Sequence, residues 1–586
     1  MLGRTDSRRR LIVLVVALVI CAGALTARLA WWQIVQGGDM AVLAHRQTHL
    51  RMEVDDGRGT IYDRSGTVVL ATTVDRTRVV AAADRLDHEA RTRDALVLAR
   101  ILGLDQVARV DLEERLRSGR AYVVVARDVD PDTSELIRSA IRDGSLVGIS
   151  LEIESKRLYP QAGGAPGTSL AAHLLGFVNR DGEGQYGVEQ YYDDQLSGSP
   201  TVFEAEKDAN GRAIPDTQLV VAPGVPGADV RLTIDTGLQL LVEQEVLAAW
   251  IADAPRAVSA VVLDPHTGEI YASATYPSYD ANSYSAMAAE DPLRFIDPIV
   301  SEVYEPGSVF KMVTVVAGLE QGTITPRMPV VDDPILVLDG GRTRVRDADR
   351  RGKGEMLLED AIAQSRNVVA AKIALGLGPN LRASSAALYE TWRQLGFGER
   401  TGIDLANGAF GQGVAVTPIQ LARAYAAMVN GGQLVTPHVV ASVGDREATI
   451  PAAPQVIAAE HGPTLTWMLN HVVTSVKQYA VGTLVPDHFV GGKTGTAQIW
   501  DAEAGAWKDS TYHFSFVGYI GRRIGQPELI VAVRITELRP TVLSAGVYEM
   551  PIKSWELFRR VAMDAIAIPG LLPELPPSEP VVAVRG

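Results

Sequence analysis

The sequence predicts an α+β multidomain protein in which an N-terminal transmembrane helix precedes a mixed α/β region and a larger domain whose sheet unites distant segments. Three observations predict this fold class. The chain has 586 residues, more than a single hydrophobic core usually organises. Residues 11–27 form one uncharged apolar run. Strand-like segments stand at both ends of the C-terminal half with apolar helices between them, which is typical of an α+β domain.

The apolar run is long enough to cross a membrane. Extended to Trp32, it covers about 22 residues, or about 33 Å of helix, against a bilayer core of about 30 Å. Arg8, Arg9 and Arg10 precede it, so we expect the N-terminus in the cytoplasm and everything after the run outside. A cleaved signal peptide is the alternative, but the run is long for one, so we favour an uncleaved anchor.

Composition excludes several classes of partner and cofactor. The net charge of −14 argues against nucleic acid as a main partner. Cys21 is the one cysteine, so no internal disulfide and no cysteine cluster for a metal can form, and we expect neither a metal nor a cofactor. Lysine is scarce, with 9 among 56 basic residues, so each lysine is a candidate for chemistry that arginine cannot perform.

The region before residue 226 mixes short strands and helices, and the chain changes character after it. Alternating patterns predict strands at 78–81 and 121–125 and helices at 95–102 and 134–142. The Pro/Gly-rich stretch 222–227 indicates a domain boundary. The predicted segments are a cytoplasmic tail at 1–10, a transmembrane helix at 11–32, the mixed domain at 33–225, the larger domain at 226–567 and a proline-rich tail at 568–586.

The larger domain begins with a helix and a hairpin. Asp235 is placed to cap a helix at 235–250, and the turn at 264–268 should join strands 257–263 and 269–274. The remaining predicted elements are strands near 488–500, 512–520 and 528–536 and a last helix at 551–566.

The first candidate site is the segment 305–311. Pro306 and Gly307 lead into an apolar helix, and a spacing of three residues puts Ser308 and Lys311 on one face of it. Burial in such a helix lowers the pKa of a lysine, and a neutral amine beside a hydroxyl is a base beside a nucleophile. The alternative is a capping serine followed by a surface lysine.

Two further segments carry candidate site residues. Ser365 and Asn367 lie in a polar break within an apolar stretch, where they could relay protons and hold a substrate amide, or simply cap a helix. The glycines of 491–496 permit close approach to a ligand, Lys493 supplies a cation, and the Thr496 N–H could pair with that of Ser308 as an oxyanion hole. A plain turn is the alternative for this segment.

Taken together, the three segments resemble the Ser-x-x-Lys, Ser-x-Asn and Lys-Thr-Gly motifs of penicillin-binding proteins and serine β-lactamases. Over nearly its whole length the chain resembles class B penicillin-binding proteins, and its Tyr304-Glu305 lead-in is more similar to the division-type members. Further segments similar to the family are 58–66, 157–160, 175–178, 187–189, 410–413 and 417–418. The segment between Asp404 and Phe410 is shorter than is usual there.

The resemblance implies a pedestal (dimerisation-type) domain and a transpeptidase domain with a central antiparallel sheet covered by helices. It implies a D,D-transpeptidase that cross-links peptidoglycan stem peptides through a serine acyl-enzyme, is acylated by β-lactams and works with a multi-span glycan polymerase at the cytoplasmic membrane. The catalytic residues that it implies are Ser308, Lys311, Ser365 and Asn367, and the substrate-binding residues are Lys493, Thr494, Gly495 and Thr496.

Two other functions fit the same motifs. A D,D-carboxypeptidase or a β-lactamase uses the same serine and differs in what removes the acyl group. A β-lactam-sensing receptor or a division scaffold would bind without turnover. The long pedestal and the anchor favour the transpeptidase, and only about ten residues would lie inside the cell for a sensor to signal through.

Overall fold

The computed structural model describes residues 7–54, 57–208, 213–405, 415–501, 503–544 and 547–572. The chain divides into two units, the first made of Met1–Arg58 with Ser197–Gly227 and the second of Gly59–Leu196 with Ala228–Gly586. Four predicted features fall at least partly outside the described residues: the start of the cytoplasmic tail (1–6), the short segment between Asp404 and Phe410, the family-like segment 410–413 and most of the proline-rich tail (573–586).

The first unit holds the apolar helix and a small sheet. α1 (Ser7–Ala30) continues through the π-helical turn η1 (Trp31–Val35). Within the described residues, this stretch is the one helix long and apolar enough to cross a membrane, at Arg8–Val35. The unit's other elements are α2 (Gly37–Thr48), β1 (His49–Val54), β8 (Thr201–Glu206), η3 (Pro215–Thr217) and β9 (Leu219–Ala222), with the strands antiparallel in the order β1-β8-β9.

The second unit begins with a sheet that joins distant parts of the chain. The strands run in the order β18-β17-β10-β2-β3-β4, and β5 pairs with β3. They are β2 (Ile61–Tyr62), β3 (Val69–Ala81), β4 (Val123–Val129), β5 (Ile149–Leu158), β10 (Val230–Leu232), β17 (Val440–Val443) and β18 (Arg446–Glu447).

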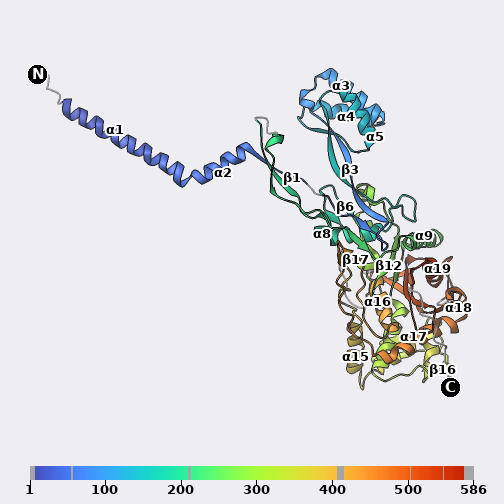
Figure 1. Cartoon of the computed structure of the whole chain (residues 1–586). Coiled ribbons are helices and arrows are strands. Elements are labelled where there is room, and N and C mark those ends of the chain that lie inside the picture. The colour runs from blue at the N-terminus through green and yellow to red at the C-terminus, as the bar shows by residue number, and fades with distance from the viewer. Residues whose placement is uncertain are drawn as a thin grey trace. The chain divides into compact units, whose positions relative to one another are not determined.

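Three helices form a separate core at one end of the long strand β3. They are α3 (His88–Ile101), α4 (Gln106–Arg117) and α5 (Pro131–Arg142), and Figure 1 shows them gathered there. Asp87, Asp105 and Asp130 cap the three helices, each accepting a bond from a backbone N–H in the first turn. Leu98 and Ile137 are fully buried among these helices and the strands. The helices predicted at 95–102 and 134–142 are therefore confirmed.

A five-stranded antiparallel sheet is the centre of the larger domain. Its order is β12-β11-β21-β20-β19, which puts β19 at one edge. The strands are β11 (Ala257–Leu263), β12 (Ile270–Tyr276), β19 (Phe489–Asp501), β20 (Ala506–Gly521) and β21 (Leu529–Leu538), all near their predicted positions. Within this sheet β11, the first strand along the chain, pairs with β21, the last, so distant segments meet as the α+β prediction requires.

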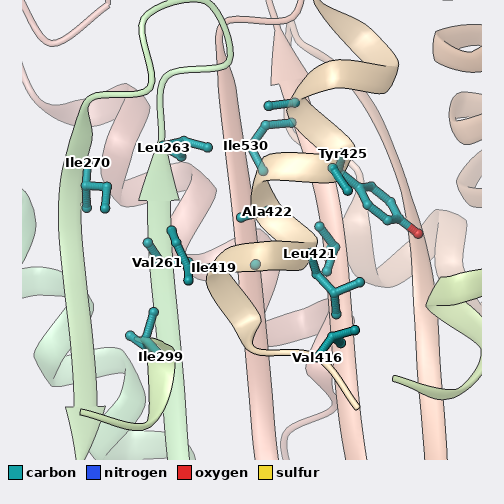
Figure 2. Close-up of a cluster of buried hydrophobic side chains, with 14 of the residues drawn as sticks. Val261, Leu263, Ile270, Ile299, Val416, Ile419, Leu421, Ala422, Tyr425 and Ile530 are labelled. Atoms are coloured by element: carbon teal, nitrogen blue, oxygen red, sulfur yellow. The ribbon is translucent and has the colours of Figure 1, made fainter. Parts of the chain in front are cut away.

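Helices cover both faces of this sheet, because alternate side chains on its strands are apolar on either side. α9 (Thr236–Asp253), capped by Asp235 as predicted, and α19 (Ser554–Ala567) cover one face, where Phe516 packs against Phe558. α16 (Pro418–Val429) lies on the other, and Figure 2 shows its side chains beside Val261 and Ile530 of the sheet.

The remaining elements are helices and short strand pairs, of which α11 and α17 pack against α16. The helices are α6 (Ala172–Leu175), α7 (Gly187–Tyr191), α8 (Asp193–Ser197), α10 (Tyr284–Glu290), α11 (Pro298–Ser301), α12 (Lys311–Glu320), α13 (Leu358–Ala363), α14 (Asn367–Leu375), α15 (Leu381–Gln394), α17 (Gly462–Ser475) and α18 (Lys477–Thr483). The short strand pairs are β6 (Phe177–Val178) with β7 (Gly184–Gln185), β13 (Pro329–Asp332) with β16 (Gly354–Leu357), β14 (Leu336–Leu338) with β15 (Thr343–Val345), and β22 (Thr541–Ser544) with β23 (Val547–Glu549).

Candidate active site

Ser308 lies in a tight turn that enters α12. The turn is the 3-10 helix η6 (Gly307–Phe310), and the Tyr425 hydroxyl anchors it by donating to the Val309 carbonyl at 2.7 Å. Gly307 has φ +61, a conformation that favours glycine, and a Cβ added there would lie 2.7 Å from the Thr496 carbonyl oxygen. The turn therefore packs directly against the backbone of strand β19.

The Lys311 amine faces the second candidate segment. Its Nζ donates to Asn367 Oδ1 at 2.6 Å, to Ser365 Oγ at 3.0 Å and to the Ser365 carbonyl oxygen. The Ser308 hydroxyl has no hydrogen-bond partner among the described residues and is half-buried, so it is available to a ligand. The structure thus brings Lys311, Ser365 and Asn367 together, next to a serine with an unengaged hydroxyl.

Burial lowers the pKa of Lys311 well below the usual range of lysine, as the apolar helix predicts. The charge of Lys493 lowers it further, Asp347 opposes this by raising it, and Arg366 has a smaller lowering effect. A lysine in these surroundings gives up its proton far more readily than one on the surface, which suits it to act as a base.

The polar break that carries Ser365 is confirmed. α13 ends at Ala363 and α14 begins at Asn367, so Ser365 occupies the turn between two helices. Ser365 has φ +60, uncommon for a residue other than glycine, and three backbone hydrogen bonds from this turn to α13 hold it. The turn aims the Ser365 hydroxyl at both lysines.

The third segment lies on the edge strand β19. Lys493 is fully buried, and its Nζ donates to Ser365 Oγ at 3.1 Å and to Thr494 Oγ1 at 3.3 Å. Burial lowers the pKa of Lys493 to about 7. Thr494 is also buried, whereas Thr496 is exposed two residues further along. Gly495 lets the strand approach the turn, since a Cβ there would lie 2.7 Å from the Pro306 carbonyl oxygen.

The three segments therefore meet around one hydroxyl. Ser365 Oγ lies 3.0 Å from one lysine amine and 3.1 Å from the other, although 128 residues separate it from Lys493 in the chain. Such an arrangement can deprotonate a nucleophile, pass a proton on and bind an anionic group. Sequence motifs did not indicate three supporting contacts: Tyr425 on the serine turn, the Tyr479 hydroxyl near Thr494, and the ion pairs of Arg366.

Comparison with known proteins matches both halves of the chain. Residues 258–539 match the family model of the penicillin binding protein transpeptidase domain, and residues 54–232 match that of the penicillin-binding protein dimerisation domain. Stage V sporulation protein D of Bacillus subtilis is 29% identical over 577 residues, covering 93% of this chain and 84% of that protein. Peptidoglycan D,D-transpeptidase FtsI of Escherichia coli is 30% identical over 442 residues, covering 71% and 70%.

Solved structures share the fold. Penicillin binding protein 2X from Streptococcus thermophilus superposes with a TM-score of 0.68 at 21% identity, over 89% of this chain and 81% of that one. Penicillin binding protein 3 from Mycobacterium tuberculosis, complexed with aztreonam, gives a TM-score of 0.62 at 24% identity, over 87% and 96%. The predicted fold class is thereby confirmed.

Proposed function

Since the chain belongs to the class B penicillin-binding proteins, of the division-type branch, we propose that it is a peptidoglycan D,D-transpeptidase that cross-links stem peptides through an acyl-enzyme on Ser308. One observation carries the assignment of residues. The Ser308 hydroxyl, which makes no hydrogen bond within the described part of the chain, stands three residues from the half-buried Lys311, whose amine, together with that of Lys493, converges on the Ser365 hydroxyl.

In the first step Lys311, as the free amine, takes the proton of Ser308 while Ser308 Oγ attacks the carbonyl carbon of the penultimate D-Ala of a stem peptide. The lowered pKa of Lys311 makes the free amine more accessible than that of a surface lysine. The C–N bond to the terminal D-Ala then breaks, and the leaving amine takes a proton. Ser365 Oγ, hydrogen-bonded to both lysines, is placed to relay it.

Strand β19 would bind and polarise the substrate. As an edge strand it can pair with an extended peptide, with Asn367 and the Thr496 side chain contacting the peptide and its carboxylate. The backbone N–H groups of Ser308 and Thr496 would form the oxyanion hole, an assignment supported by the close packing of Gly307 on Thr496. Loss of one such donor typically costs about 10²–10³ in rate.

In the second step the amine of an acceptor stem peptide attacks the ester carbonyl. It loses a proton to the Lys311 amine, the C–O bond to Ser308 breaks, and Ser308 Oγ recovers its proton. The product is the cross-linked peptide, and the enzyme returns to its starting state. A β-lactam would acylate the same oxygen.

Labelling with a fluorescent penicillin tests the assignment. Ser308→Ala should abolish covalent labelling while the protein stays folded. Ser301→Ala, a half-buried serine at the end of α11 whose side chain is outside the site, is the matched control and should label normally. A drug adduct on Ser365 in intact-mass and peptide analysis would contradict the assignment. Product analysis with a donor and an acceptor peptide separates transfer from hydrolysis.

The apolar helix suggests where the enzyme works. We assign it as a single-pass anchor in the cytoplasmic membrane with the N-terminus inside, supported by its length and by Arg8–Arg10 before it. The substrate strand then emerges near the membrane from a partner, a multi-span glycan polymerase, and anchoring raises the effective concentration of that strand at Ser308.

A further inference from the structure

A buried ion cluster lies directly behind the second catalytic segment. Arg366 stands between Ser365 and Asn367, and its side chain is only 6% exposed. Its guanidinium makes ion pairs with three carboxylates: Asp332 at 2.8 Å, Asp349 at 3.0 Å and Asp347 at 3.2 Å. Burying this many charges is costly unless the charges are paired and hydrogen-bonded, so we expect the cluster to have a function.

The cluster holds the backbone of the second segment in place. Asp347 Oδ1 accepts the backbone N–H of Asn367, while Asn367 Nδ2 donates to the Arg346 carbonyl at 2.9 Å. Asp332 Oδ2 accepts both Arg366 Nε and the Lys353 backbone N–H at 2.8 Å. These bonds tie the loop 346–353 to the strained turn at Ser365.

The two innermost carboxylates, those of Asp332 and Asp347, contact the same guanidinium. The side chains of Asp332 and Asp347 are 0% and 2% exposed. Among the described residues, Asp332 Oδ1 has no hydrogen-bond donor, and Asp347 Oδ2 makes no hydrogen bond but lies 3.2 Å from an Arg366 nitrogen in the ion pair. Two like charges in one buried site favour retention of a proton by one of them. Burial raises the pKa of Asp347 most, the backbone N–H of Asn367 lowers it, and the neighbouring carboxyl of Asp332 raises it.

We propose that Arg366 is a positioning residue for Ser365 and Asn367, and that Asp332 and Asp347 share one proton and present a single negative charge behind Lys311. The inference rests on the proposed function, because it assigns the cluster a task in acylation. One proton held by the two carboxyls would give Asp332 Oδ1 the hydrogen-bond partner that it lacks among the described residues. The remaining charge of the pair offsets that of Arg366.

Which of the two carboxyls carries this single charge should affect the pKa of Lys311. The charged groups facing the Lys311 amine are Lys493 from β19, Arg366 from the turn before α14, and Asp347 from the loop after β15. Arg366 faces the carboxyl pair and also pairs with the half-exposed Asp349, on which the charge of Lys353 acts. Asp347 is the carboxylate that acts on Lys311, so moving the charge between the two carboxyls should change the pH at which Lys311 becomes a free amine.

Two asparagine variants of the full-length protein test the shared proton. Asp347→Asn leaves the charge on Asp332, away from Lys311, so the rise of the penicillin acylation rate with pH should move to lower pH. Asp332→Asn leaves a full charge on Asp347, so the rise should move to higher pH. Shifts of both variants to lower pH would mean two independent charges and overturn the sharing, and so would unchanged profiles.

A second measurement serves if Asp332→Asn does not fold. The infrared carbonyl band of a protonated carboxylic acid should lose intensity in Asp347→Asn, and full intensity would overturn the sharing. Failure of the proposed function itself is distinguishable, because Ser308→Ala would then still be acylated. If Ser308 is the acylated residue and the pH profiles of both asparagine variants are unchanged, the shared proton is wrong while the proposed function stands.

Arginine-to-lysine exchange tests the positioning role. Lysine cannot bond three carboxylates with the planar geometry of a guanidinium, so Arg366→Lys should lower acylation by about 10²-fold through displaced site groups. Arg157→Lys is the matched control, a buried arginine paired with Glu189 outside the site. It should lower the unfolding temperature and keep acylation within about threefold of wild type when measured below that temperature. Equal acylation losses in both variants would overturn the positioning role.

Discussion

Gly307→Ala is the sharpest test of how the serine turn depends on strand β19. Alanine at φ +61 costs about 1–2 kcal/mol in backbone strain. Its Cβ would also stand 2.7 Å from the Thr496 carbonyl oxygen and 3.0 Å from the carbonyl carbon. The first contact is about 0.7 Å shorter than an ordinary contact of 3.4 Å, and both atoms belong to backbone. The turn and the strand must therefore separate by about that amount.

A matched glycine isolates the contact from the strain. Gly322, just after the same helix, has φ +63, and a Cβ there meets nothing within 4 Å. Gly322→Ala should therefore lose the same stability as strain alone and keep normal acylation. Gly307→Ala should lose more stability and acylate about 10²-fold more slowly, since misplacement by about 1 Å of reacting groups costs about that factor.

The assay is the second-order rate constant of acylation by a fluorescent penicillin, with thermal unfolding measured on the same samples. The ratio of the two variants removes the common backbone strain. If Gly307→Ala acylates within about threefold of Gly322→Ala, the packing of the turn on Thr496 does not position the nucleophile, and the oxyanion-hole assignment loses its support.

Three other perturbations separate chemistry, architecture and anchoring. Lys311→Arg should acylate about 10²–10⁴-fold more slowly, because arginine cannot take up the serine proton. The control Lys372→Arg, on α14, should acylate at the normal rate. Near-normal rates in Lys311→Arg would mean that Lys311 has only a structural role. Glu189→Ala leaves the buried Arg157 charge without its carboxylate, so the free energy of unfolding should fall by about 3–5 kcal/mol. A fall of less than about 1 kcal/mol in a denaturant titration would mean that the ion pair is dispensable. Replacing residues 1–32 by an unrelated anchor should leave purified labelling intact but impair cross-linking in cells, and full support of growth would show that the helix has no specific partner.

Local rules predicted the elements well where a single segment decides its own structure. Asp235 caps α9 through a bond from the Leu238 N–H, and the Asp-Pro-x-x-Gly turn does join two antiparallel strands. The three-residue spacing from Ser308 to Lys311 survives, although the serine stands in a 3-10 turn rather than within the α-helix. In each case the signal lies within a few residues of its effect.

The supporting residues of the site could not be predicted in this way. Asp347 belongs to a polar, arginine-rich loop that looks like an exposed surface segment until the chain returns and places it under Asn367. Arg366 is the variable position of a Ser-x-Asn pattern, and only its three carboxylate partners in the structure show that it supports the site. Tyr425 sits on an apolar helix where any core aromatic would fit, and its contact with the Val309 carbonyl spans 116 residues.

The choice between arginine and lysine inside this chain follows from whether a charge must stay or move. Arg157 and Arg366 stand in buried ion pairs, where a guanidinium keeps its proton and so holds a constant charge. Lys311 and Lys493 are the buried amines beside Ser365, and burial lowers the pKa of both. Under the proposed mechanism Lys311 releases and regains a proton in each turnover, which an arginine cannot do. Exchange of the two side chains should therefore be harmful in both directions, by loss of a base at Lys311 and by loss of a fixed, branched donor at Arg366.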